Sequence, residues 1–305
     1  MRLRVEVPAT VANLGPGFDC FGLAVDLVNV ATIDTEAPPR MHVTGEGLGE
    51  LPQDGSNLVV RSMAMLAVEA GRKLPPFEMR SENRIPLARG LGSSAGAIVA
   101  GLILADRLLE TNLALERLLT LGADAEGHAD NVAAALLGGA TLAYLGAGGW
   151  RAERLAVDDS LRPVLLIPEH ERISTDDARR VLPREVPRTA ATSNSARTAL
   201  LVLALGGRAD LLAEALDDRL HQDARLRLAP GAQRVFQDLK AAGTPVCVAG
   251  SGPTLLAFER EGVEMPELGP SWRVIRTRVR PRGAEVTDAA AAGPEPATSP
   301  AAGES

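Results

Sequence analysis

The chain has 305 residues, of which 46% are hydrophobic and 23% charged, and its formal net charge is −7. This length allows two compact domains, and the acidic balance excludes the broad positive field that nucleic-acid binding needs. Cys20 and Cys247 form no CxxC pair, which predicts free thiols. No apolar run is long enough to cross a bilayer or to act as a leader, so we expect a cytoplasmic protein with no membrane contact.

Hydrophobic periodicity predicts mixed strands and helices in the first half of the chain. In chain order we expect a strand at 2–7, strands at 24–35 and 40–44, a helix at 57–70, a strand at 77–83, helices at 94–110, 114–125 and 131–137, and a strand at 140–144. The helix at 94–110 is apolar on nearly all sides at its start, which is typical of a buried helix.

The second half of the chain is also predicted to contain both strands and helices. In chain order we expect a strand at 163–168, helices at 174–182, 193–205, 209–217 and 231–242, and strands at 245–249, 254–258 and 272–278. The class is therefore α/β or α+β. The glycine-rich and charged stretch at 146–162 is the expected boundary, giving domains at 1–155 and 156–283. The Ala, Gly, Pro, Ser and Glu residues of 284–305 have no periodicity, which predicts a disordered tail.

The segment PLARGLGSSAGA at 86–97 opens the apolar helix. Gly90 and Gly92 permit positive φ and the close approach of a ligand. Ser93 and Ser94 supply hydroxyls where free N–H groups and the helix dipole favour phosphate. The absence of Gly-Lys-Ser/Thr excludes a Walker A loop, and the displaced third glycine argues against a dinucleotide fingerprint. A structural turn is the alternative, but the apolar helix behind the loop favours phosphate binding and hence an ATP-dependent small-molecule kinase.

Three further segments gather polar groups or glycines: PATVANLGPGFD at 8–19, EGHADN at 126–131 and AGSGPT at 249–254. Each segment also has a purely structural explanation: a capped turn at 8–19, a core histidine at 126–131 and a plain hairpin at 249–254. Glu, His, Asp and Asn crowded together favour a site, and their spacing excludes an HExxH metal centre. One carboxylate beside a hydroxyl and phosphates suits Mg²⁺, which keeps several waters.

Taken together, these segments resemble the GHMP kinase superfamily. PATVAN at 8–13 is similar to its first motif, PLARGLGSSA at 86–95 to its second and VAGSGPT at 248–254 to its third. Within the superfamily, the homoserine kinases are the most similar branch. Their marks are VPATVANLGPGFDCFGLAVD at 7–26, EGHADNVAAALLGG at 126–139, STDDARRVLP at 174–183 and RLRLAPG at 225–231. The resemblance extends over about residues 4–280.

This resemblance implies a two-domain GHMP kinase fold. The N-terminal domain would be similar to domain 2 of ribosomal protein S5, and the C-terminal domain would be ferredoxin-like. The implied reaction is the Mg²⁺-dependent transfer of phosphate from ATP to L-homoserine, giving O-phospho-L-homoserine, in threonine biosynthesis. A homodimer is also implied.

The resemblance also implies roles for individual residues. The ATP phosphates would be held by Pro86, Leu87, Ala88, Arg89, Gly90, Leu91, Gly92, Ser93, Ser94, Ala95 and Gly96. The Mg²⁺ partners would be Ser94 and Glu126, and these two with Asn131 would form the catalytic set. The amino-acid pocket would be lined by Asn13, Asp19, His128, Asn131, Thr175, Arg179 and Arg225. Asp130 is the obvious base by eye, but we rank Asn131 above it, because phosphoryl transfer needs positioning more than a strong base.

Some assignments stay open in the sequence. Ala129 stands where the family often has proline, and three neighbours could replace the residues chosen: Ser93 for Ser94, Arg180 for Arg179, and Arg227 for Arg225. A mevalonate-type GHMP kinase is the alternative enzyme. A non-catalytic GHMP-fold binding protein is a further alternative, but it would be expected to lose the loop or the metal carboxylate.

Overall fold

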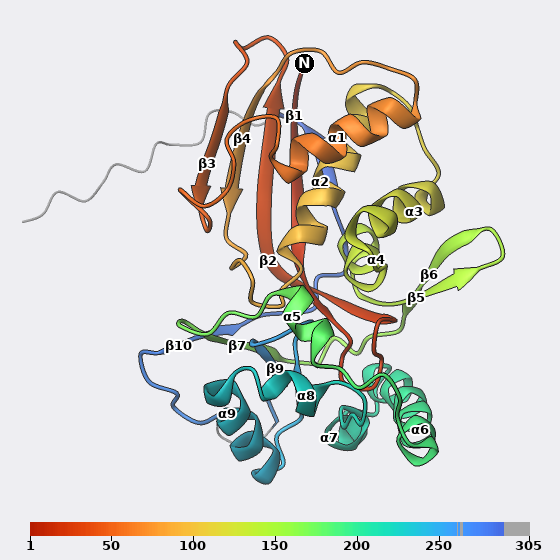
Figure 1. Cartoon of the computed structure of the whole chain (residues 1–305), viewed down its shortest axis with the longest axis vertical. Helices are drawn as coiled ribbons and strands as arrows, with labels where there is room; N and C mark the ends of the chain where they lie inside the picture. Colours follow the sequence, from red (N-terminus) through yellow and green to blue (C-terminus); the bar gives the residue numbers. More distant parts are fainter. Residues whose placement is uncertain (261, 263–264, 290–305) are drawn as a thin grey trace, which may run out of the picture.

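The computed structural model describes residues 1–260, 262 and 265–289, and it contains two sheets, each covered by helices (Figure 1). The first sheet consists of β1 (Arg2–Ala12), β2 (Phe21–Asp34), β3 (Met41–Gly45), β4 (Glu78–Asn83), β5 (Ala140–Gly146), β6 (Gly149–Leu155) and β11 (Glu285–Asp288). Its main path runs β11-β1-β2-β4-β3, and β5 joins it by pairing with both β2 and β6.

Four helices cover one face of the first sheet (Figure 1). They are α1 (Leu58–Glu69), α2 (Ser93–Leu108), α3 (Leu115–Glu126) and α4 (Asp130–Leu137). Alternation along β1 puts Leu3, Val5 and Val7 on this face, and all three are buried with the apolar side chains of α2. The predicted burial of the apolar helix is therefore confirmed. In the described part of the chain, no helix combines the length and apolarity needed to cross a membrane.

The second sheet consists of β7 (Pro163–Pro168), β8 (Val246–Val248), β9 (Leu255–Phe258) and β10 (Trp272–Arg276), in the order β10-β7-β9-β8. All neighbours are antiparallel, so β7 and β8 run parallel with β9 between them, which is the split βαβ arrangement of ferredoxin-like folds. The helical segments between β7 and β8 are α5 (Thr175–Arg180), α6 (Arg188–Leu205), the 3₁₀ turn Ala209–Leu211, α7 (Leu212–Ala215), α8 (Gln222–Leu226) and α9 (Pro230–Ala241).

The glycine-containing loops meet where the two sheets join. The Thr10 N–H donates to the Leu91 carbonyl at 3.1 Å, and the Gly250 N–H donates to the Ala12 carbonyl at 3.1 Å. A Cβ on Gly90 would overlap the carbonyl oxygen of Ala249. The end of β1, the loop before α2 and the loop between β8 and β9 are therefore in direct backbone contact.

Several elements differ from the sequence expectations. β1 continues to Ala12, so half of the 8–19 segment is strand rather than turn, and α6 begins at Arg188, five residues early. Strand β6 and helix α8 were not predicted. In β6, half-buried Trp150 and Ala152 alternate with exposed Arg151 and Glu153, but this short edge strand, paired only with β5, lies in the glycine-rich and charged stretch expected to be a domain boundary.

The C-terminal region corrects the expected tail at 284–305. Glu285–Asp288 form β11, which pairs antiparallel with β1 from Leu3↔Asp288 to Glu6↔Glu285. The segment is too short and polar to read as a strand from its sequence, but the open edge of β1 supplies the hydrogen-bond partners. The rest of the expected tail, 290–305, lies outside the described residues.

Truncation at this strand should measure its contribution. A chain ending at Gly283 loses the four β1–β11 pairs and the Arg280–Glu285 ion pair of 3.3 Å. Because each cross-strand pair contributes roughly 0.2–1 kcal/mol, we expect the free energy of unfolding to fall by about 1–4 kcal/mol in urea denaturation. A chain ending at Ala289 is the matched control, since it keeps every β1–β11 pair. Equal unfolding midpoints for the two chains would show that β11 adds no stability.

Candidate active site

One cleft at the junction of the two sheets gathers most of the predicted site residues. Its cavity volume is about 180 Å³. Its lining includes Asn13, Asp19, Pro86, Ala88, Arg89, Gly90, Leu91, Gly92, Ser93, Ser94, Glu126, His128, Asn131, Thr175, Arg179 and Arg225. Of the predicted residues, Leu87, Ala95 and Gly96 do not line it. Unpredicted residues in the lining are Ala12, Asp130, Ile173, Ser174, Gly250 and Ser251.

The glycines of the 86–97 loop are required by the protein's own packing. Gly90 and Gly92 have φ values of +74° and +67°, in the left-handed region that favours glycine. A Cβ on Gly92 would overlap the Thr10 hydroxyl and lie 2.9 Å from Asn131 Oδ1. Gly92 is also the N-cap of α2, a helix of 16 residues, so free N–H groups and the positive end of the helix dipole open at the cleft. The loop can therefore bind an anion.

Arg89 contacts protein rather than the open part of the cleft. It is buried, and its guanidinium donates to the carbonyl of Pro168 at 3.0 Å and to that of Glu169 at 2.8 Å. Burial lowers the pKa of this guanidinium. Arg89 therefore ties the loop to the end of β7.

Ser94 and Glu126 form a hydroxyl–carboxylate pair beside the loop. The Ser94 hydroxyl donates to Glu126 Oε2 at 2.6 Å. Burial raises the pKa of Glu126, while the Ser94 hydrogen bond and His128 act in the opposite direction. Within the described residues, no group of three or more His, Cys, Asp and Glu side chains is placed to hold a metal by itself. Two oxygen donors fit Mg²⁺, which takes its other ligands from phosphates and water.

A buried polar chain runs from His128 to β1. His128 Nδ1 lies 2.6 Å from Asp130 Oδ1, which also accepts from the Asn131 N–H at 2.7 Å. The Thr10 hydroxyl donates to Asn131 Oδ1 at 2.7 Å, so the Asn131 amide nitrogen is the donor end, with one long contact of 3.5 Å to Asp130 Oδ1. Burial opposes the protonation of His128, but the Asp130 hydrogen bond and the charges of Asp130 and Glu126 raise its pKa overall.

Asn13 shapes the turn that presents Asp19. Asn13 has a φ of +72°, its Oδ1 accepts from the Asp19 N–H at 3.0 Å, and its amide donates to the Gly250 carbonyl at 2.9 Å. The Asp19 carboxylate lines the cleft, where the loss of water and the charge of Asp130 raise its pKa, while Arg179 and Arg225 oppose the shift. Asp19 is therefore the acidic group available to a cationic ligand, whereas the Asn13 side chain is engaged within the protein.

Two arginines from the C-terminal half face this carboxylate. Arg179 is exposed on α5, which Figure 1 shows beside the start of α2, and it lines the cleft with the buried Arg225 of α8. Arg180 instead pairs with Asp177 at 2.9 Å on the outer side of α5. Arg227 is exposed on a different surface. The geometry thus places Arg179 and Arg225, rather than their neighbours, at the cleft.

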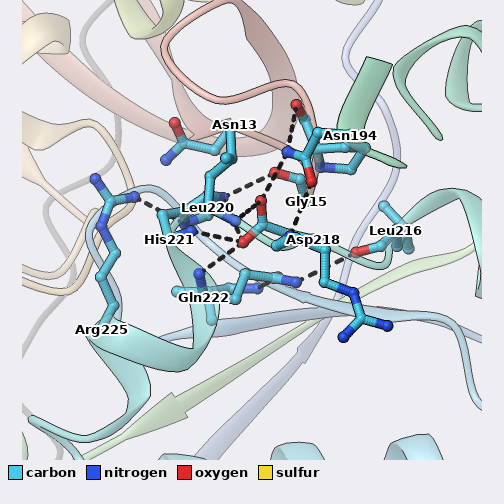
Figure 2. Close-up of polar contacts among 12 residues, drawn as sticks. Asn13, Gly15, Asn194, Leu216, Asp218, Leu220, His221, Gln222 and Arg225 are labelled. Atoms are coloured by element: carbon cyan, nitrogen blue, oxygen red, sulfur yellow. Dashed lines mark hydrogen bonds and ion pairs between the residues drawn. The ribbon is translucent and has the colours of Figure 1, made fainter. Parts of the chain in front are cut away.

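Sequence reasoning missed a buried polar network behind Arg225, which Figure 2 shows. Asp218 accepts from the N–H groups of Leu220 at 3.0 Å and of His221 and Gln222 at 2.8 Å, and from the Asn194 amide at 2.9 Å. Asp218, His221 and Gln222 lie in the polar run DDRLHQD at 217–223, which was a signal that the sequence analysis did not use, whereas Asn194 has no such mark. The polar run also lies just before the RLRLAPG run at 225–231.

Known proteins match the chain closely. Residues 57–139 match the family model described as the GHMP kinases N terminal domain. A homoserine kinase of Streptomyces avermitilis is 40% identical, covering 95% of this chain and 97% of that protein. One of Synechocystis is 41% identical, with shares of 87% and 88%. The crystal structure of a homoserine kinase from Cytophaga hutchinsonii has a TM-score of 0.81 and 28% identity, and covers 94% of this chain and 97% of that chain.

The likeness extends over nearly the whole of both chains, in sequence as well as in structure. The GHMP kinase fold expected from the resemblance is confirmed by this homoserine kinase structure, which matches over 94% of this chain with a TM-score of 0.81. This protein belongs to the homoserine kinase family of GHMP kinases and is a transferase of that class.

Proposed function

We propose that the protein transfers the γ-phosphoryl group of Mg-ATP to the hydroxyl of L-homoserine, giving ADP and O-phospho-L-homoserine in threonine biosynthesis. One observation carries the proposal. A single cleft combines the N-terminus of α2, the Ser94–Glu126 oxygen pair, and Asp19 opposite Arg179 and Arg225. Phosphates, a divalent cation and a zwitterionic amino acid each find complementary groups there.

The nucleotide end of the cleft is the loop at 86–96. The backbone at the start of α2 would bind phosphate oxygens, and Ser94 and Glu126 would hold Mg²⁺, with Ser93 beside them in the lining. When bound, Mg²⁺ neutralises charge that develops on the transferred phosphoryl group. Arg89 contributes by fixing the loop to β7 rather than by a direct charge contact.

The acceptor end of the cleft suits a small amino acid. Asp19 would pair with the ammonium group, and Arg179 and Arg225 with the carboxylate, while Thr175, Asn13 and His128 complete the wall. The Asn131 amide nitrogen would position the hydroxyl. Asp130 is 2% exposed and its Oδ1 is already occupied by His128 and the Asn131 N–H, which favours Asn131 over Asp130 at the reacting group.

A substrate panel tests this proposal. ADP release should follow the addition of L-homoserine, but not of mevalonate, galactose or threonine. Turnover of mevalonate with none of homoserine would reject the assignment. In the same assay, Asp19→Asn should raise KM for homoserine by roughly tenfold or more, because a charged hydrogen bond contributes about 1.5–3 kcal/mol, while KM for ATP stays near the native value. A mevalonate enzyme, whose acceptor has no ammonium group, would be indifferent to this change.

We also propose that the protein acts as a homodimer in the cytoplasm. Family membership supports both statements, and the acidic surface balance, with a net charge of −7, suits a freely diffusing enzyme of small molecules. Light scattering of the purified protein tests the dimer, since a mass of 31.9 kDa corresponds to the single chain.

A further inference from the structure

Arg225 is held by one end of its guanidinium. Its Nη1 donates to the Gly250 carbonyl at 2.8 Å and faces His221 Nδ1 at 3.2 Å, so both Nη1 hydrogens are engaged. Among the described residues, Nε has no hydrogen-bond partner. Nε is also enclosed by protein, so Nη2 is the end of the guanidinium left for a carboxylate in the cleft.

The hydrogen bonds around His221 define its tautomer. His221 Nε2 lies 2.8 Å from the Gly15 carbonyl oxygen, which can only accept, so Nε2 carries the proton. In the neutral ring, Nδ1 is then an acceptor with its lone pair directed at Arg225 Nη1. A protonated ring would point an N–H at the guanidinium and lose this bond.

The surroundings keep the ring neutral and fixed. His221 is 1% exposed, and its ring stacks on Phe18 with centroids 5.1 Å apart. Burial, assisted by the charge of Arg225, lowers the pKa of His221 to about 4, although Asp218, with Oδ2 3.8 Å from Nε2, acts in the opposite direction. Asp218 instead binds the backbone N–H of His221 and so sets where α8 begins (Figure 2).

We propose that His221 is a positioning residue for Arg225: its Nδ1 lone pair and the Gly250 carbonyl together hold Nη1 and so direct Nη2 toward the carboxylate of the acceptor. This inference rests on the proposed function, in which Arg225 binds that carboxylate. A guanidinium held in this way has lost its rotational freedom before the substrate binds. Binding therefore costs less side-chain entropy. The charged groups around Arg225 are Asp19, Asp130, Asp218 and Arg179, and none of them is hydrogen-bonded to it.

Two matched substitutions test the roles of the two ring nitrogens of His221 separately. His221→Asn places an amide oxygen near the position of Nδ1 and keeps the acceptor for Arg225. His221→Gln places an amide nitrogen near Nε2 and keeps only the donor to Gly15. Both remove the ring and its stacking on Phe18. We expect the Gln variant to raise KM for homoserine by roughly tenfold or more, and the Asn variant to stay within about threefold of native, with KM for ATP unchanged in both.

A third variant and a control keep the test decisive if these chains fold poorly. His221→Phe keeps a stacked ring without either nitrogen, and it should raise KM for homoserine as the Gln variant does. His42→Phe is the control, because His42 is exposed on β3 and does not line the cleft. This variant should leave KM for homoserine and KM for ATP at their native values. Equal KM values for the Asn and Gln variants, or a native KM for the Phe variant, would overturn the positioning role. A native KM in Arg225→Ala would overturn the assignment of the carboxylate to Arg225, whereas failure of the native enzyme to use homoserine would overturn the proposed function.

Discussion

Replacing Glu126 with glutamine is expected to lower kcat/KM by roughly 10²–10³-fold, the cost of losing one well-placed electrostatic group at a reacting phosphoryl centre. Glutamine keeps the shape of the side chain and can still accept from the Ser94 hydroxyl, a bond of 2.6 Å in the native chain. What it loses is the negative charge. Because that charge is proposed to bind Mg²⁺, the Mg²⁺ concentration for half-maximal rate should rise as well. Steady-state kinetics over a Mg²⁺ titration measures both changes.

A control on the same helix separates this effect from surface charge. Asp124 is exposed on α3, two residues before Glu126, and does not line the cleft. Asp124→Asn removes the same formal charge and should leave kcat/KM at its native value. If Glu126→Gln also stayed within about threefold of native, the assignment of Glu126 to the metal would be wrong.

Replacing Gly92 with alanine is expected to reduce the free energy of unfolding by about 2–5 kcal/mol. Part of this is the left-handed backbone, with a φ of +67°, which costs a residue with a side chain about 1–2 kcal/mol. The rest is overpacking of roughly 1–3 kcal/mol, because the new Cβ would overlap the Thr10 hydroxyl. Thr10 would have to move away from Asn131, so turnover should fall together with stability.

Gly71→Ala isolates the backbone contribution. Gly71 follows α1 with a φ of +61°, and a Cβ there would meet nothing within 4 Å. This variant should therefore lose only the left-handed cost, about 1–2 kcal/mol, and keep full activity. Urea denaturation of both variants gives the difference. Equal destabilisation would mean that the Thr10 contact adds nothing at Gly92.

Local sequence was informative wherever a residue's role depends on its immediate neighbours. The helix behind the 86–97 loop was predicted from its apolar character, and β1 from its alternation, because side-chain period is set within a few residues. The cleft residues at 126–131 were found in the same way. Their types, spaced closely between apolar helices, favour a site before any contact is known.

Contacts between residues far apart in the sequence could not be predicted from local patterns. β11 exists because residues 285–288 reach the open edge of β1 at residues 3–6, and its own short sequence does not predict a strand. Arg89 was expected to help hold phosphate, yet the carbonyls at 168 and 169 accept from its Nε and Nη2, while Nη1 has no hydrogen-bond partner among the described residues. In both cases the partner lies far away in the sequence, and loop closure rather than local propensity brings it close.

The sequence by itself determined which residue types are available: a glycine-serine loop opening a helix, and the carboxylates and arginines to which the resemblance gives roles at a metal and an amino acid. Only the tertiary structure decided which of the paired arginines reaches the cleft, because one helical residue step turns a side chain by about 100°. It also decided that Arg225 Nη1 donates to the Gly250 carbonyl, since this contact joins α8 to the loop between β8 and β9, whereas the facing His221 lies only four residues before Arg225. The type of a residue is given by the sequence, whereas the direction of its side chain depends on what the fold packs against that side chain.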